Sequence, residues 1–269
     1  MFHPALSGLI DTEGYEFIPQ THDTQKLNSI VAENNRVDVS AVSLHAYAYF
    51  HEHYLLLPHG ASVGRNYGPV LITKKPNNLA GLSGKSIAVP GLQTTAYLVL
   101  KLMIPDAQPQ IVPIEPFYRI FDEIERESVD AGLLIHEGRL FYQERGFFLV
   151  QDIGKWWFNQ FQLPLPLGVN VIRKSLGDDH IRNISRILKN SIRYSLDHRD
   201  EMIKLWMHED KRGVKELENY GKVDEYLSLY ANDDTAEFSE DTKKASQLLM
   251  DLGFERGIIP HSVKLEWSE

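Results

Sequence analysis

The segment Val129–Glu137 most constrains the fold of this chain, because an apolar run ends there on an ionisable ring. Small and branched apolar residues fill positions 131–135 without polar alternation, and such a run indicates a strand buried on both faces of an α/β sheet. Ligands of these sheets bind beyond the carboxyl ends of the strands. His136 stands at such an end, and histidine changes charge near neutral pH. It is therefore a candidate catalytic residue, although a capping histidine fits the spacing equally well.

A second copy of this pattern occurs earlier in the chain. Val37–Ser43 again places Val-Asp before small and apolar residues, and this copy delivers Ser43. An amphipathic helix is expected before each copy. The apolar faces of these helices are Leu27, Ile30 and Val31 in the first, and Phe117, Ile120, Phe121 and Ile124 in the second. Two similar helix–strand units predict two α/β lobes, each with a polar residue at the edge of a shared cleft.

The lobe boundaries are expected where the periodicity stops. Residues 74–83 combine Lys, Pro, Asn and Gly without a repeat, which is typical of a loop. Two prolines stiffen the apolar run 163–168, which suits a return crossing between lobes. We therefore expect a first, larger lobe from 1–74 and 174–269, with C-terminal helices, and a second lobe from 75–173.

Local patterns predict further elements. We expect a short strand at 17–20, a helix from Asp23 or Thr24 to about Asn34, and a helix over 44–53. Apolar spacing beyond residue 181 predicts helices that pack back on the first lobe. This helical tail shows no cluster of catalytic residue types.

A candidate ligand site lies at the start of a predicted helix. The strand Ser86–Val89 is followed by the turn 90–95 and an apolar helix over 96–103. The free N–H groups and the dipole of a helix N-terminus favour carboxylate or phosphate. Thr94 and Thr95 can either cap this helix or bind a ligand. The turn lacks the Gly-Lys-Ser/Thr of a P-loop.

Composition excludes several classes of protein. The 269 residues include no cysteine, so disulfides and thiolate metal sites are excluded. No apolar run reaches the ~20 residues of a membrane helix, and positions 1–10 do not resemble a secretion signal. The net charge of −9 argues against a nucleic-acid partner. We expect a cytoplasmic protein with a small anionic ligand.

One histidine-rich stretch partly matches a metal-binding motif. His51-Glu52-His53 resembles part of a zinc motif, but helical zinc ligands are four residues apart. Histidines two apart on a helix point in different directions. We expect no metal site, and we expect the following residues to lie at the surface: His45, His51, His53 and His59.

Several of these segments together resemble the 1,4-dihydroxy-6-naphthoate synthases of the futalosine route to menaquinone. The resemblance rests on Gly91–Tyr97, Ala131–Glu137 and Leu163–Gly168, in this order, and the loop 64–69 also fits. It implies the two-lobed α/β fold of type II periplasmic binding proteins. It also implies cleavage of cyclic dehypoxanthine futalosine to 1,4-dihydroxy-6-naphthoate and dihydroxyacetone, with no cofactor. The family's general base falls on His136, and its substrate-binding positions fall on Ala41, Val42, Ser43, Thr94, Thr95 and Ala96.

The chain departs from this family at its start. Family members begin with a strand and a Ser-Pro-Cys-Pro-Asn-Asp-Thr-type loop before the helix that matches Phe2–Leu6. Without that strand, backbone groups of the first sheet would lack partners, at about 1–3 kcal/mol for each buried group. We therefore expect the natural chain to begin upstream of Met1.

Three other functions stay open at this point. A solute-binding protein of a transporter would share the fold but would not need a base at position 136. The chorismate-dehydrating enzyme of the same route shares the lobes, but we do not expect it to combine Ile135-His136-Glu137 with the 163–168 run. An effector-binding regulatory domain would require a DNA-binding domain beside it.

Overall fold

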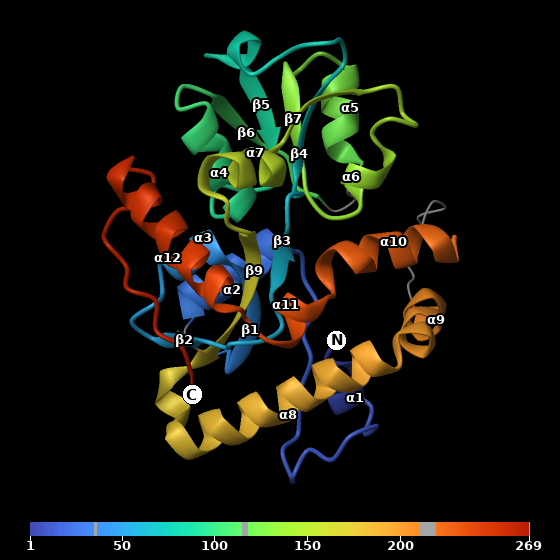
Figure 1. The fold of residues 1–269 in the computed structure, drawn as a ribbon, viewed down its shortest axis with the longest axis vertical. Coiled ribbons are helices and arrows are strands. Elements are labelled where there is room, and N and C mark those ends of the chain that lie inside the picture. The colour runs from blue at the N-terminus through green and yellow to red at the C-terminus, as the bar shows by residue number, and fades with distance from the viewer. Residues whose placement is uncertain (35–36, 115–117, 210–218, 269) are drawn as a thin grey trace.

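The computed structural model describes residues 1–34, 37–114, 118–209 and 219–268. Two sheets form separate lobes, one above the other in Figure 1. The lower lobe holds both termini. Phe117, which belongs to the helix face expected before the strand that ends at His136, lies outside the described residues.

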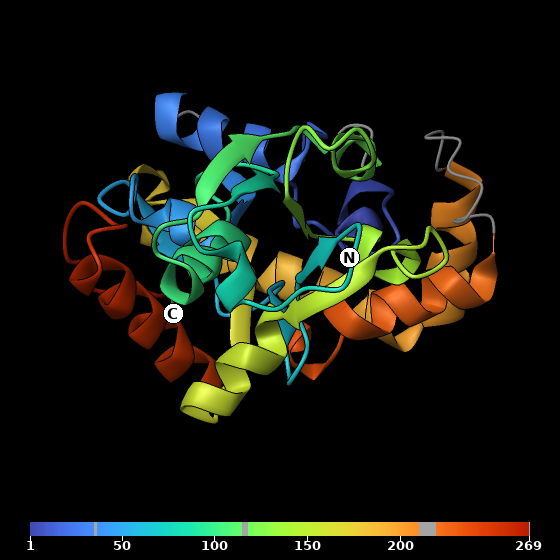
Figure 2. The same ribbon diagram turned by 90° about the horizontal axis from the view of Figure 1, so that it is seen from above.

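The first lobe is built on a sheet in which three strands pair antiparallel with a long central strand. Its strands are β1 (Val39–Ser43), β2 (Tyr54–Leu56), β3 (Ser62–Gly64) and the central β9 (Leu165–Arg173). Its helices are α1 (His3–Leu6), α2 (Thr24–Asn34), α3 (Leu44–Tyr47), α8 (Asp178–Asp197), α9 (Arg199–Glu209), α10 (Tyr220–Tyr230), α11 (Asp233–Ala236) and α12 (Glu240–Glu255). In both views, α12 and α10 lie on opposite sides of the molecule (Figures 1 and 2).

The second lobe holds a mixed sheet with strand order β6-β5-β7-β4-β8. Its strands are β4 (Val70–Thr73), β5 (Ser86–Val89), β6 (Gln108–Ile111), β7 (Ala131–Leu134) and β8 (Phe148–Asp152). Its helices are α4 (Thr95–Met103), α5 (Arg119–Glu125), α6 (Gly138–Phe141) and α7 (Ile153–Phe161). β5 and β7 run parallel, so the residues that follow them emerge at the same edge of the sheet.

The chain changes sheet earlier than the expected boundaries at 74 and 173. β4 already belongs to the second sheet, where it pairs with β7 and β8. β9 already belongs to the first sheet and pairs there with β1. The changeovers therefore lie between residues 64 and 70 and between residues 161 and 165. Each crossing leads directly into a strand of the next lobe, β4 or β9. The loop-like composition of residues 74–83 therefore marks a loop inside the second lobe and not the boundary between the lobes.

β7 is the buried strand that the sequence predicts. All four of its residues are buried, and Gly132 allows α5 to pack closely on it. A Cβ atom at Gly132 would lie 2.5 Å from the Cγ2 of Ile120 and 2.7 Å from the Cδ1 of Ile124. The small residue in this strand therefore matches the helix that covers it.

Two local predictions were wrong. Residues 17–20 form no strand; Phe17 packs on an apolar cluster while Ile18 is 82% exposed. Since residues 17–20 add no strand, β1 lies at the edge of its sheet and has β9 as its one strand partner among the described residues. The helix expected over 44–53 ends at Tyr47, because the chain must return to pair β2 with β9.

The expectation of four surface histidines was wrong for two of them. His45 and His59 are each 1% exposed. The His45 Nδ1 lies 3.2 Å from the carbonyl oxygen of Thr94, and the His59 Nε2 lies 3.0 Å from the Oγ of Ser185. Each ring keeps one buried nitrogen without a hydrogen-bond partner, the Nε2 of His45 and the Nδ1 of His59. Packing of α3 against α4, and of the loop after β2 against α8, buries these rings.

A buried carboxylate ties the helical tail to the crossing between the lobes. Asp234 in α11 is 3% exposed and accepts two hydrogen bonds from Arg65, at 2.6 and 2.8 Å. The hydroxyl of Thr242 in α12 donates to the same carboxylate at 2.9 Å. α11 and α12 are thereby held against the segment that leaves β3.

Replacing Asp234 with alanine is expected to lower the free energy of unfolding by about 2–3 kcal/mol, because the buried hydroxyl of Thr242 and the Arg65 guanidinium lose their acceptor. Arg65 is half exposed, so water can solvate part of its charge and moderate the loss. Urea denaturation followed by circular dichroism measures the effect. Asp233→Ala, at the exposed neighbouring position, serves as the control. Equal losses in the two variants would contradict this role for Asp234.

Candidate active site

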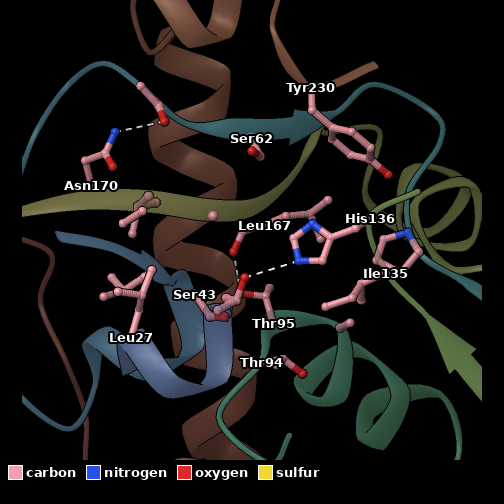
Figure 3. A pocket seen from close by; sticks show the side chains of 18 of the residues that line it. Leu27, Ser43, Ser62, Thr94, Thr95, Ile135, His136, Leu167, Asn170 and Tyr230 are labelled. Carbon is pink, nitrogen blue, oxygen red and sulfur yellow. Dashed lines mark hydrogen bonds between the residues drawn. The ribbon is translucent and has the colours of Figure 1, made fainter. Parts of the chain in front are cut away.

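A cavity of about 360 Å³ lies between the lobes (Figure 3). It has the size of a site for a small organic molecule. All seven residues predicted for the site line it: His136, Ala41, Val42, Ser43, Thr94, Thr95 and Ala96. The structure thus brings them together, while their roles stay predictions. Figure 3 shows the His136 ring pointing toward Ser43 and Thr95.

His136 enters the cavity from a backbone turn just beyond β7. Its φ is +52°, a left-handed conformation that costs a non-glycine residue about 1–2 kcal/mol. Such strain persists where the surrounding structure enforces it, often at functional sites. The Nε2 lies 3.2 Å from the Oγ1 of Thr24, and the Nδ1 lies 3.4 Å from the Oη of Tyr226. Both hydroxyls come from the first lobe, so the ring bridges the cleft.

Ser43 is the last residue of β1, in the lobe opposite the one that carries His136. The buried side-chain amide of Asn28 holds it in place. The N–H of Ser43 donates to the Oδ1 of Asn28 at 2.8 Å, and the Nδ2 of Asn28 donates to the Ser43 hydroxyl at 3.2 Å. Asn28 is fully buried in α2. Because the Ser43 oxygen already accepts this bond, its own proton is directed elsewhere. The arrangement prepares Ser43 to donate to a ligand.

The threonines at the start of α4 hold the backbone in place. Thr94 caps the helix: its hydroxyl accepts from the N–H of Tyr97 and donates to the carbonyl of Gly91. The Thr95 hydroxyl donates to the carbonyl of Leu167 in β9 at 2.6 Å, which links the two lobes. The first N–H groups of a helix have no acceptor within it. The backbone of Thr95 and Ala96 is therefore the part of this turn suited to an anion.

The cavity contains no formally charged side chain among its described lining residues, histidine apart. An anionic group bound there would meet backbone N–H groups, hydroxyls and the dipole of α4. Such donors bind a carboxylate without a paired side-chain cation. The net negative charge of the chain therefore does not exclude an anionic ligand.

Several lining residues were not predicted from the sequence. The polar ones are Thr24, Ser62, Asn170, Tyr226 and Tyr230. The two tyrosines come from α10, in the helical tail, where the sequence shows no cluster of catalytic residue types. Burial raises the pKa of Tyr230 to about 12, so this phenol stays protonated near neutral pH. The helical spacing of the two tyrosines was visible in the sequence, but buried core residues have the same spacing.

An ion pair beside the cavity supports the turn that carries His136. Arg139 in α6 lies 3.2 Å from the carboxylate of Asp152, and both side chains are mostly buried. Burial raises the pKa of Asp152. Arg139 also donates to the carbonyl of Gly68, and the Asp152 carboxylate caps α7. The pair thus joins the turn after β7 to the crossing between the lobes.

No described group of three or more His, Cys, Asp or Glu residues is arranged to hold a metal ion. None of the described helices combines the length and apolar character needed to cross a membrane.

Comparisons with solved structures identify the fold. A crystal structure of a protein from Archaeoglobus fulgidus is 37% identical and superposes with a TM-score of 0.87, covering 96% of this chain and 93% of that one. The alkanesulfonate-binding protein of Xanthomonas axonopodis pv. citri is 16% identical, with a TM-score of 0.64 over 89% of this chain and 82% of that one. These likenesses confirm the α/β fold of the periplasmic-binding-protein type.

Two curated relatives share about a third of their residues with this chain. The 1,4-dihydroxy-6-naphthoate synthase of Streptomyces coelicolor is 32% identical over 86% of this chain and 80% of its own length. The enzyme of the same name from Thermus thermophilus is 33% identical over 80% of this chain and 76% of its own length. The family model described as menaquinone biosynthesis matches residues 1–255. With this match over nearly its whole length, and with relatives that are synthases, the chain belongs to the menaquinone biosynthesis family.

Proposed function

We propose that this protein is a carbon–carbon lyase. It converts cyclic dehypoxanthine futalosine to 1,4-dihydroxy-6-naphthoate and dihydroxyacetone, with His136 as the general base. The observation that carries this proposal is the convergence of all seven residues implied by the resemblance on one interlobe cavity. Two relatives named as 1,4-dihydroxy-6-naphthoate synthases support the reaction.

The chemistry of the cavity suits this reaction. Cleavage of a carbon–carbon bond that releases a three-carbon polyol fragment begins with removal of a proton from a hydroxyl or a carbon. A neutral imidazole can take that proton, and a positioned base contributes typically about 10²–10⁴-fold. The strained turn at His136 presents the ring to the cavity. Movement of the lobes toward each other would exclude water from the bound substrate.

The substrate's aromatic carboxylate requires an anion site at a fixed distance from the base. The N-terminus of α4 supplies N–H groups and a favourable dipole. Ser43, fixed by Asn28, supplies a hydroxyl donor from the opposite lobe. We assign the carboxylate to the start of α4, and the polyol fragment to the side of the cavity near Ser43.

Turnover by the purified protein tests this function directly. Incubation with cyclic dehypoxanthine futalosine is expected to yield the naphthoate and dihydroxyacetone in equal amounts, measured by mass spectrometry. Chorismate, offered in parallel, is expected to remain unchanged. Loss of water from chorismate would instead indicate the dehydratase of the same route. Saturable binding of the futalosine derivative without any product would indicate a solute-binding protein.

A further inference from the structure

The helix α10 lies against the turn that carries His136, although the two belong to different lobes. Residues four apart share one face of a helix. Figure 1 shows α10 beside α6, which follows this turn. Three residues on one face of α10 meet residues of the second lobe: Lys222 pairs with Glu144 at 2.6 Å, Tyr226 reaches His136 at 3.4 Å, and Tyr230 lies close enough to Arg139 for that guanidinium to act on its pKa.

Packing fixes the position of α10 on this turn. Val223 is fully buried in one apolar cluster with Phe141 of α6 and Ile203 of α9. The side chain of Asn219 caps α10 by accepting from the N–H of Lys222. The ammonium of Lys222 also lies over the Phe141 ring, 5.5 Å from its centroid. Because anchors flank Tyr226 on both sides, its hydroxyl is held at the imidazole.

A base in this position needs a hydrogen-bond acceptor for the N–H of its other ring nitrogen. A neutral imidazole that takes a proton at one nitrogen must already carry a proton on the other. The Nε2 lies 3.2 Å from the Oγ1 of Thr24 and is the ring nitrogen on the side of Ser43 and Thr95 in Figure 3, so it is the nitrogen suited to take the substrate's proton. The Nδ1 then carries the N–H, and the oxygen of Tyr226 lies within hydrogen-bond distance of it.

We propose that Tyr226 is a positioning residue that holds His136 in the Nδ1–H tautomer, so that the Nε2 lone pair faces the substrate. This role rests on the proposed function of His136 as the base. After proton transfer both imidazolium N–H groups meet a hydroxyl oxygen, that of Tyr226 on Nδ1 and that of Thr24 on Nε2. Hydrogen bonds to a charged group are stronger than those to a neutral one, so Tyr226 favours the protonated intermediate more than the resting enzyme.

Tyr226→Phe tests this role, because it removes one oxygen and keeps the ring. We expect kcat to fall about tenfold with KM unchanged, because the variant loses a hydrogen bond that strengthens when the imidazole becomes charged during the reaction. Long-range ¹H–¹⁵N spectra of the imidazole nitrogens, with the His136 signals identified by their absence in His136→Gln, are expected to show a loss of the Nδ1–H tautomer. Tyr220→Phe is the matched control: its hydroxyl, also on α10, is exposed and bonds Asp200 outside the cavity.

The outcomes separate this role from the proposed reaction. A tautomer shift in Tyr226→Phe, absent in Tyr220→Phe, supports the positioning role even if the wild type fails to cleave the futalosine derivative; that failure would reject the proposed function alone. An unchanged His136 spectrum in Tyr226→Phe overturns the role. A wild-type spectrum already dominated by the Nε2–H tautomer overturns it as well. A fall in kcat of the same size in both variants would show that α10 tolerates neither change and would also reject it.

Discussion

Replacing His136 with glutamine is expected to lower kcat for the futalosine derivative by about 10²–10⁴-fold, the usual contribution of a positioned general base. Substrate binding should persist, because the backbone N–H groups of α4 and the Ser43 hydroxyl are untouched. Steady-state turnover measures the first effect, and calorimetric titration of the variant with substrate measures the second. Glutamine keeps a polar side chain in the turn but cannot accept the proton at neutral pH.

The control for this variant is His53→Gln, at an exposed position outside the cavity. It should retain wild-type kcat. Full activity of His136→Gln would remove the imidazole from the mechanism. A loss of binding as large as the loss of turnover would mean that His136 holds the substrate rather than acting on it.

Acidification is expected to destabilise this protein through its two buried histidines. Burial lowers the pKa of both His45 and His59 to about 4, whereas an unfolded histidine titrates near 6.5. The unfolded chain therefore binds more protons between these values, and the free energy of unfolding falls as the pH decreases from about 6.5 to about 4. Above about pH 6.5 both histidines are neutral in the folded and in the unfolded chain, so their contribution to the free energy of unfolding no longer changes with pH. From pH 7 to pH 5 the two rings together should cost roughly 3–4 kcal/mol.

Urea denaturation at a series of pH values measures this dependence. The double variant His45→Asn, His59→Gln keeps a side-chain donor near the nitrogen that each ring uses, but neither new side chain titrates. Carboxylates also contribute to acid denaturation, so the difference between variant and wild type isolates the histidines. We expect a shallower pH dependence in the double variant, and the wild-type slope in His53→Gln. Parallel curves for the double variant and the wild type would contradict the prediction.

The residues that lie along single strands and helices could be predicted from the sequence. β5 has the predicted bounds, and α4 begins one residue before its predicted start. The strand that ends before His136 was recognised because buried α/β strands are continuous apolar runs. Ser43, Thr94 and Thr95 follow from a strand end and a helix start, whereas the family resemblance supplies Ala41, Val42 and Ala96. The structure places all of them on one cavity with His136.

The residues that reach the cavity from distant parts of the chain could not be predicted in this way. Tyr226 lies ninety residues from His136, as the sequence separation of the pair shows, and its spacing matches that of an ordinary core position. Asn28 acts through Ser43, and nothing in the helix that carries it marks that contact. His45 appeared solvated because local sequence does not reveal that α3 packs on α4.

The amino-acid sequence by itself determined the two α/β lobes, the strand that presents His136 and the helix start opposite Ser43, because these depend on periodicity and turn chemistry among neighbouring residues. The tertiary structure alone decided where the chain changes sheet, which histidines are buried and which hydroxyls meet the imidazole. Those outcomes depend on contacts between residues far apart in the chain, and the free energy of such contacts is set by packing geometry that no local pattern contains.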